Sequence, residues 1–297
     1  MSKWPQCIAA GACAMVLTSA AHAAVVYNGG TYSQSFDSLP NTPTDTNIET
    51  SAFTDGWQDD VDPAVSAQND VSIPGWYLWH SVSPAAENGF NGNQRMRIGA
   101  GGANTGAFMS FGAAATTERA LGAVGSTTIA NQPTGTPPAN DTRILIAARL
   151  TNNTADTLNE FTLTFDGEQW RDGGRSAVSE TMEFQYQVGA TAINDAAGWI
   201  TPAANGGSWT SLVQNNSTTG AAVDGNTTGK VPVSVTVTGV NWGPGTDLWL
   251  RWNDPQALGN DHGMAIDNVS FAAVVPEPTS LALLGLAGLG LLARRRQ

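Results

Sequence analysis

The pentapeptide Phe161-Thr162-Leu163-Thr164-Phe165 alternates apolar and polar side chains without a break. Successive side chains of a β-strand point to opposite faces, so this pattern predicts a strand with one buried face. The same alternation occurs at residues 182–188 and 231–237, and residues 144–150 and 248–252 also carry apolar side chains at every second position. Clusters of Gly, Asn, Asp and Pro separate these runs and are typical of turns. Many short strands with such turns predict an all-β fold, a single β-sandwich of the jelly-roll type.

Composition narrows the class of protein further. Both cysteines of the 297-residue chain lie within the first 13 residues, so no disulfide is expected in the remainder. Residues 24–273 contain 24 acidic and 9 basic side chains, a net charge of about −15. Such a surface repels phosphate backbones, which disfavours nucleic acid as a partner. We expect one domain over residues 24–273, with the Gly-, Thr- and Pro-rich residues 121–141 as a loop.

The first 23 residues have the three parts of a secretory signal peptide. Lys3 supplies the positive region, residues 8–17 are apolar, and Ala21-His22-Ala23 forms a small-x-small cleavage site. Cleavage by signal peptidase is predicted between Ala23 and Ala24. The alternative, a buried N-terminal helix, is disfavoured because the apolar run is short and ends in small residues.

The C-terminal residues 274–297 form a second processing segment. Pro276-Glu277-Pro278 precedes an apolar run, and Arg294-Arg295-Arg296 follow it. The run predicts a short transmembrane helix, although a full span needs about 20 residues. This order of features resembles the PEP-CTERM sorting signal. The resemblance implies processing by an exosortase, membrane contact only through the tail, and a place in the envelope, outer surface or extracellular matrix of a Gram-negative bacterium. A permanent tail anchor is the alternative.

The middle of the chain carries motifs that resemble those of secreted bacterial β-sandwich modules. These are Ser35–Leu39, Ile73–Tyr77, Glu118–Gly122, Gly167–Arg171, Leu248–Asp254 and Gly259–Val269. The strand Ala265-Ile266-Asp267-Asn268-Val269 also resembles the last strand of lectin-like and carbohydrate-binding jelly rolls. This likeness concerns the fold and does not identify a ligand.

Four aspartates are candidates for a structural Ca²⁺ site. If Val269 and Phe271 face the core, Asp267 shares their face and must be paired, hydrogen-bonded or metal-bound. Asp254 and Asp261 lie upstream, and pairing of the first and last strands would bring Asp37 close. Oxygen-only clusters suit Ca²⁺. In the favoured alternative, Asp267 accepts backbone N–H bonds from residues 253–263 and binds no metal, because no EF-hand spacing is present.

Glu168 is the candidate carboxylate for glycoside hydrolysis, together with a second acid such as Glu183. The alternative is a structural ion pair of Glu168 with Arg171 or Arg251. No nucleophile elbow, phosphate-binding loop or dinucleotide fingerprint is present. We therefore expect no catalytic residues and no enzyme.

Tryptophans are candidate sugar-stacking residues. Trp76, Trp170 and Trp249 could bind a glycan, and Trp249 is predicted to lie on the surface because it shares a face with Arg251. The alternative is that most tryptophans lie in the core, and the sequence does not decide between core and surface for Trp76, Trp79 and Trp170. Trp252 shares a face with Leu248 and is assigned to the core.

The leading hypothesis is a non-enzymatic exported module that binds extracellular polysaccharide. The alternatives are a secreted glycan hydrolase and a purely structural matrix protein.

Overall fold

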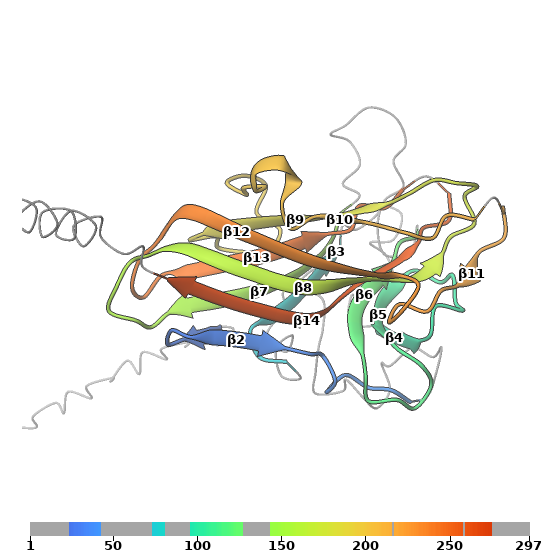
Figure 1. Cartoon of the computed structure of the whole chain (residues 1–297), viewed down its shortest axis with the longest axis horizontal. Coiled ribbons are helices and arrows are strands. Elements are labelled where there is room, and N and C mark those ends of the chain that lie inside the picture. The colour runs from blue at the N-terminus through green and yellow to red at the C-terminus, as the bar shows by residue number, and fades with distance from the viewer. Residues whose placement is uncertain are drawn as a thin grey trace, which may run out of the picture.

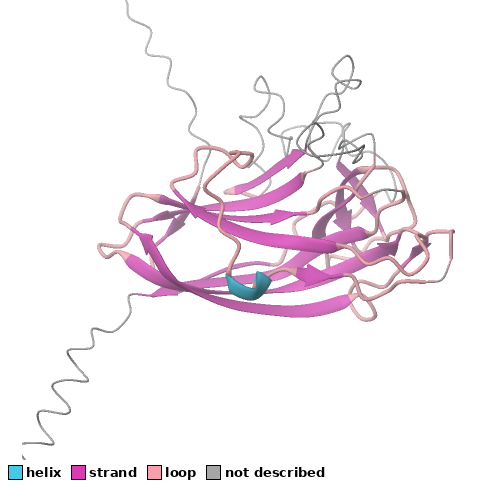
Figure 2. Cartoon of the chain, turned by 90° about the horizontal axis from the view of Figure 1, so that it is seen from above, coloured by secondary structure: helices cyan, strands magenta, loops and turns pink. Residues whose placement is uncertain are grey.

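Two β-sheets packed face to face make up the described part of the protein (Figures 1 and 2). The computed structural model describes residues 24–42, 73–80, 96–126, 143–215, 217–257 and 259–274. The six-stranded sheet runs β1 (Val25–Tyr27), β7 (Ile144–Asn152), β13 (Asp247–Asn253), β9 (Thr181–Val188) and β10 (Trp209–Thr210), and β3 (Trp76–His80) also pairs with β7. One short 3₁₀-helix spans Ala203–Asn205.

The eight-stranded sheet runs β11 (Ala221–Ala222), β8 (Leu158–Asp172), β14 (Gly263–Val274), β6 (Ala120–Val124), β5 (Ala107–Phe111) and β4 (Met96–Gly99). In addition, β12 (Lys230–Trp242) pairs with β8 and β2 (Thr31–Gln34) pairs with β14. The predicted all-β sandwich of jelly-roll type is confirmed. Each of the five alternating runs lies within a strand, namely β7, β8, β9, β12 and β13.

Trp252 lies at the centre of the core between the sheets. Its ring stacks on Trp76 at 5.6 Å between centroids, and it meets Phe165 of the opposite sheet edge to face at 5.5 Å. Phe184 packs beside it at 5.4 Å. Both Trp252 and Trp76 are fully buried, which confirms the assignment of Trp252 to the core. Aromatic contacts across the two layers therefore hold the sheets together.

A second apolar layer covers the outer face of the six-stranded sheet. Leu145 and Ala147 of β7 and Trp249 of β13 are buried there with Ala190 and Ile193, which come from the segment after β9. The prediction that these strands have a single buried face is therefore wrong for β7 and β13. The physical reason is that a loop distant in sequence covers their second face, which alternation alone does not reveal.

One sequence prediction disagrees with the structure, and several others concern residues that the structure does not describe. Residues 121–124, predicted as part of a loop, belong to β6, while 127–142 lie outside the described residues. The signal peptide (1–23), its cleavage site and nearly all of the sorting tail also lie outside them. Among the described residues, no helix has the length and apolar character required to cross a membrane.

Candidate functional site

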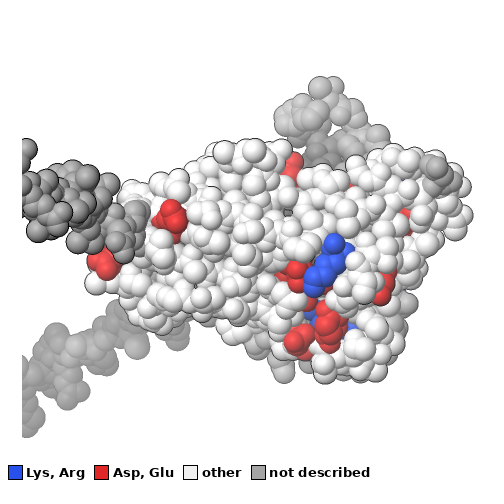
Figure 3. Space-filling view, viewed as in Figure 1, with Lys and Arg blue, Asp and Glu red and all other residues white. Residues whose placement is uncertain are grey.

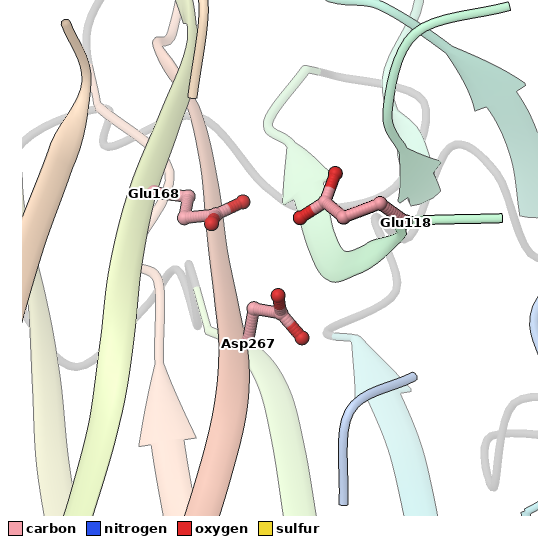
Figure 4. A group of neighbouring side chains, drawn as sticks. All are labelled: Glu118, Glu168 and Asp267. Carbon is pink, nitrogen blue, oxygen red and sulfur yellow. The ribbon is translucent and has the colours of Figure 1, made fainter. Parts of the chain in front are cut away.

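Three carboxylates converge on the outer face of the eight-stranded sheet (Figure 4). Glu118 precedes β6, Glu168 lies on β8 and Asp267 lies on β14, with one oxygen of each within 4.8 Å of the others. Glu168 and Asp267 are 0 and 1 % exposed, and Glu118 is half-buried. Figure 3 shows acidic and basic side chains gathered in one region of this side of the molecule, while most of the remaining surface in that view carries neither. We call these three residues the carboxylate cluster.

Strand register brings Glu168 and Asp267 to the same face. Residues directly opposite in antiparallel strands share a face. Glu168 is opposite Lys230 of β12, and Asp267 is opposite Asp166 of β8. Because Phe165 points into the core, Asp166 and Glu168 point outward by alternation, and Asp267 follows them.

A β-bulge turns Asp267 away from the core, so the prediction that it shares the face of Val269 and Phe271 is wrong. The β8–β14 register shifts between Asp267 and Ser270, and Asn268 has a φ of 50°. Ile266 and Val269 are therefore both core residues although they are three positions apart. Asn adopts this left-handed conformation more readily than most residues, which allows the bulge here.

Each member of the carboxylate cluster accepts one side-chain N–H bond. Trp170 donates from Nε1 to Glu168 Oε2 at 2.9 Å, and Asn268 donates from Nδ2 to Asp267 Oδ2 at 3.0 Å. Asn226 donates from Nδ2 to Glu118 Oε2. Glu168 Oε1 and Asp267 Oδ1 are buried and have no hydrogen-bond partner among the described residues. The favoured alternative, in which Asp267 accepts backbone N–H bonds from residues 253–263, is therefore not what the structure shows.

Burial and mutual repulsion perturb the two buried carboxyls. Burial raises the pKa of Glu168 to about 7, although the Trp170 bond lowers it in part. Burial raises the pKa of Asp267 to about 8; a hydrogen bond from the Asn268 backbone N–H lowers it in part, and the charges of Glu168, Glu118 and Asp37 raise it. Both groups therefore favour a compensating positive charge, either a proton or another cation.

Asp37 lies near the carboxylate cluster without belonging to it. The predicted pairing of the first and last strands is wrong, because β1 pairs with β7, and it is the second strand, β2, that runs antiparallel to β14 with Tyr32 opposite Phe271. Asp37 follows β2, is exposed, and accepts a 3.0 Å bond from the Ser35 hydroxyl. Its negative charge contributes to the raised pKa of Asp267, although Asp37 is not one of the three cluster residues.

Asp254 and Asp261 belong to a second acidic cluster with Glu180. Burial raises the pKa of Asp254 well above its usual value, and the charges of Glu180 and Asp261 add to this. Burial also raises the pKa of Glu180 to about 7 and that of Asp261 to about 6. Arg175 forms an ion pair with Glu180. The structure thus separates Asp254 and Asp261 from Asp267, whose neighbouring carboxylates are Glu118 and Glu168.

The ion pair of Glu168 with Arg171 or Arg251, the alternative to a hydrolytic role, is absent among the residues described. Arg171 donates to the backbone oxygens of Gly101 and Gly102 at 3.0 Å. Arg251 donates to Gln185 and, at 2.8 Å, to the Ile193 carbonyl. Local geometry explains the difference, because Arg171 is already turned toward the loop 101–102 and Arg251 lies in the other sheet.

The predicted tryptophan platforms are buried. Trp76, Trp170 and Trp249 are 0, 3 and 2 % exposed. The prediction that Trp249 lies on the surface is wrong, because the segment with Ala190 and Ile193 covers it. Trp170 stacks on Phe111 with 6.0 Å between centroids and uses its indole N–H to hold Glu168. None of these three rings presents an open face for stacking on a sugar.

Two grooves adjoin the carboxylate cluster on the same sheet. The β12 groove has a volume of about 290 Å³ and is lined by Thr164, Phe165, Asp166, Pro232, Val233, Ser234 and Asn268. The β11 groove has a volume of about 410 Å³ and is lined by Ala100, Ala113, Trp170, Ala222, Val223, Asp224 and Asn226. Asn268 in the first groove and Asn226 in the second both donate to cluster carboxylates, so the cluster connects the two.

Sequence reasoning missed Glu118, Asn226 and Lys230 as parts of this site. Lys230 pairs with Asp166 at 2.7 Å beside the cluster. These residues come from separate segments that only the sheet register brings together. The sequence does place Glu118 in one of the motifs shared with secreted β-sandwich modules, Glu118–Gly122, but nothing in that motif points to Glu168 or Asp267 as its neighbours.

Comparison with known proteins identifies the tail. Residues 274–297 match the PEP-CTERM protein-sorting motif. The chain therefore carries a sorting tail that indicates an exported protein directed to the cell envelope. No curated protein matches the chain.

Several solved structures resemble the fold at a distance. The CBM22-1 xylan-binding domain from Paenibacillus barcinonensis Xyn10C is 10% identical, with 83% of this chain and 96% of that chain covered and a TM-score of 0.33. The K3 cleaved adhesin domain of Lys-gingipain from Porphyromonas gingivalis W83 is 15% identical, with 67% and 91% covered and a TM-score of 0.32. Tailspike protein 4 of bacteriophage CBA120 is 10% identical, and the match spans 67% of this chain and 19% of the tailspike chain, with a TM-score of 0.31. These likenesses are too distant to inform on a ligand.

Proposed function

We propose that this protein is a non-catalytic exported module that binds polysaccharide on the outer face of its eight-stranded sheet. The observation that carries the proposal is the pair of grooves joined by the carboxylate cluster. Ser234, Thr164 and Asn268 present hydroxyl and amide groups in the β12 groove. Such groups both donate and accept hydrogen bonds, as recognition of sugar hydroxyls requires.

Burial of Glu168 supports a binding rather than a hydrolytic role. A glycosidase needs two carboxyl groups that reach opposite sides of the scissile bond. Glu168 has no exposed surface, and Asp267 is 1 % exposed. A sugar in either groove would contact the residues around these carboxyls and not the carboxyls themselves.

The sorting tail supports the proposed location and partners. The PEP-CTERM motif at 274–297 suits an exosortase as the processing enzyme and an extracellular polysaccharide as the partner. On this proposal, signal peptidase cleaves after Ala23, and the protein is retained at the outer surface or in the matrix of a Gram-negative envelope.

Affinity electrophoresis of the purified full-length chain in gels containing soluble polysaccharides tests the binding. The panel includes the host's own extracellular polysaccharide. We expect retardation by at least one polymer and a loss of affinity of about tenfold or more in Ser234→Arg, whose bulk fills the β12 groove. Thr238→Arg is the matched control, because Thr238 is exposed on the same strand and outside the groove.

Two results would count against this function. Migration unaffected by any polymer would leave the purely structural alternative. Release of reducing ends from a polysaccharide, abolished in Glu168→Gln, would establish the hydrolase instead.

A further inference from the structure

The spacing of the carboxylate cluster matches the coordination sphere of a calcium ion. Oxygens from Glu118, Glu168 and Asp267 lie within 4.8 Å of one another. Two oxygens bound to the same Ca²⁺ at 2.3–2.6 Å can be at most about 5 Å apart. The three carboxylates are therefore close enough together to share one ion.

The hydrogen bonds of the cluster leave suitable oxygens for an ion. Trp170 and Asn268 fix Glu168 Oε2 and Asp267 Oδ2. The second oxygens, Glu168 Oε1 and Asp267 Oδ1, are buried without a partner in the described part of the chain. A buried acceptor without a partner is costly, so these two atoms indicate a missing positive ligand. Neighbouring donors that orient a ligating group are typical of metal sites.

The charge around the cluster also favours a cation. Lys230 lies beside the cluster, but its ammonium contacts Asp166 at 2.7 Å. Arg119 follows Glu118 directly, yet its guanidinium donates to Ser110 and the Ala113 carbonyl. Among the described residues, the charge of Lys230 acts on Glu168 and Asp267, but neither Lys230 nor Arg119 forms a direct ion pair with the cluster.

We propose that Glu118, Glu168 and Asp267 bind one Ca²⁺ ion between the β12 and β11 grooves. An oxygen-only set selects a hard cation and disfavours zinc, which takes nitrogen and sulfur ligands. Mg²⁺ demands near-octahedral geometry at 2.0–2.1 Å, whereas Ca²⁺ accepts irregular sets completed by water. Glu118 is half-buried and provides the side from which water and the ion enter. This site does not depend on polysaccharide binding.

Thermal unfolding of the metal-stripped full-length protein tests the site. We expect CaCl₂ at about 100 times its Kd to raise the midpoint by about 5 °C or more, and MgCl₂ at the same concentration to have a smaller effect. Asp267→Asn and Glu168→Gln should abolish the calcium shift.

Asp261→Asn is the matched control, because it neutralises a buried carboxyl of the second acidic cluster. It should retain the full calcium shift. The proposal is overturned if calcium leaves the wild-type midpoint unchanged, or if Asp267→Asn keeps the shift and Asp261→Asn loses it.

Terbium luminescence gives a test that needs no variant to fold. The Trp170 indole bonds directly to Glu168, so Tb³⁺ in the cluster should emit when tryptophan is excited. Calcium should displace it and quench the signal. Tryptophan-sensitised emission that is absent, or that calcium fails to displace, would contradict a calcium site beside Trp170.

Discussion

The hydroxyl of Tyr27 shows how single polar atoms hold this sandwich together. It lies 2.7 Å from the Gly30 carbonyl and 3.1 Å from the Ala273 carbonyl, and it accepts the Ala273 N–H at 2.7 Å. We expect Tyr27→Phe to lower the free energy of unfolding by about 1–3 kcal/mol, because the buried Ala273 N–H loses its partner. Urea unfolding followed by tryptophan fluorescence measures the change.

Tyr186→Phe is the matched control for Tyr27. Tyr186 is also buried, but no hydrogen bond of its hydroxyl is found in the described structure. Its removal should change the free energy of unfolding by no more than about 0.5 kcal/mol. Equal losses in the two variants would show that the Tyr27 hydroxyl contributes nothing specific.

At the level of elements, the loop before β5 depends on a close backbone approach at Gly101. A Cβ at Gly101 would lie 1.7 Å from the Trp170 carbonyl oxygen of β8, and its φ is +82°. Gly239 has a similar φ of +74° but nothing within 4 Å of its Cβ position. Gly239→Ala should therefore cost about 1 kcal/mol from backbone strain alone.

Gly101→Ala should cost clearly more than Gly239→Ala, about 3 kcal/mol or more, since β8 must shift to admit the methyl group. The two variants are compared by urea denaturation under the same conditions. Equal destabilisation would mean that the loop moves freely relative to β8.

The sequence predicts the positions of the strands better than it predicts which segments cover them. Alternation located β7, β8, β9, β12 and β13 because each has one face in the common core. It failed for Trp249, whose cover comes from a remote segment, and for β6, whose small residues do not alternate. The site was predicted only in part. Burial of Asp267 was foreseen, but the bulge at Asn268 reverses the face on which it lies.

Across the whole molecule, buried acids make stability depend on pH. Burial raises the pKa of Glu180 to about 7 and of Asp261 to about 6, and also raises that of Asp254. Between about pH 4 and pH 7 the folded state therefore holds protons that the unfolded chain releases. Stability from this cluster is fully present below pH 4 and is lost as the pH rises through 6 to 7. In EDTA, Glu168 and Asp267 contribute with the same sign.

We expect the midpoint of thermal unfolding in EDTA to fall between pH 5 and pH 8, with a loss of free energy on the order of 3 kcal/mol. Asp254→Asn should flatten this decline and be more stable than the wild type at pH 8, because the amide needs no proton to remain neutral. A midpoint that stays constant or rises over this range would contradict the assignment of protonated buried carboxyls.

Strand β14 has a mechanical consequence for a protein carrying a sorting tail. Its last residue, Val274, is also the first residue of the matched motif. β14 is flanked by β8 on one edge and by β6 and β2 on the other. A pulling force applied to the tail would act along the axis of β14. The hydrogen bonds between β14 and its neighbouring strands lie across this axis, so many of them would have to break at the same time. The strand next to the sorting motif is therefore held by neighbouring strands along both of its edges.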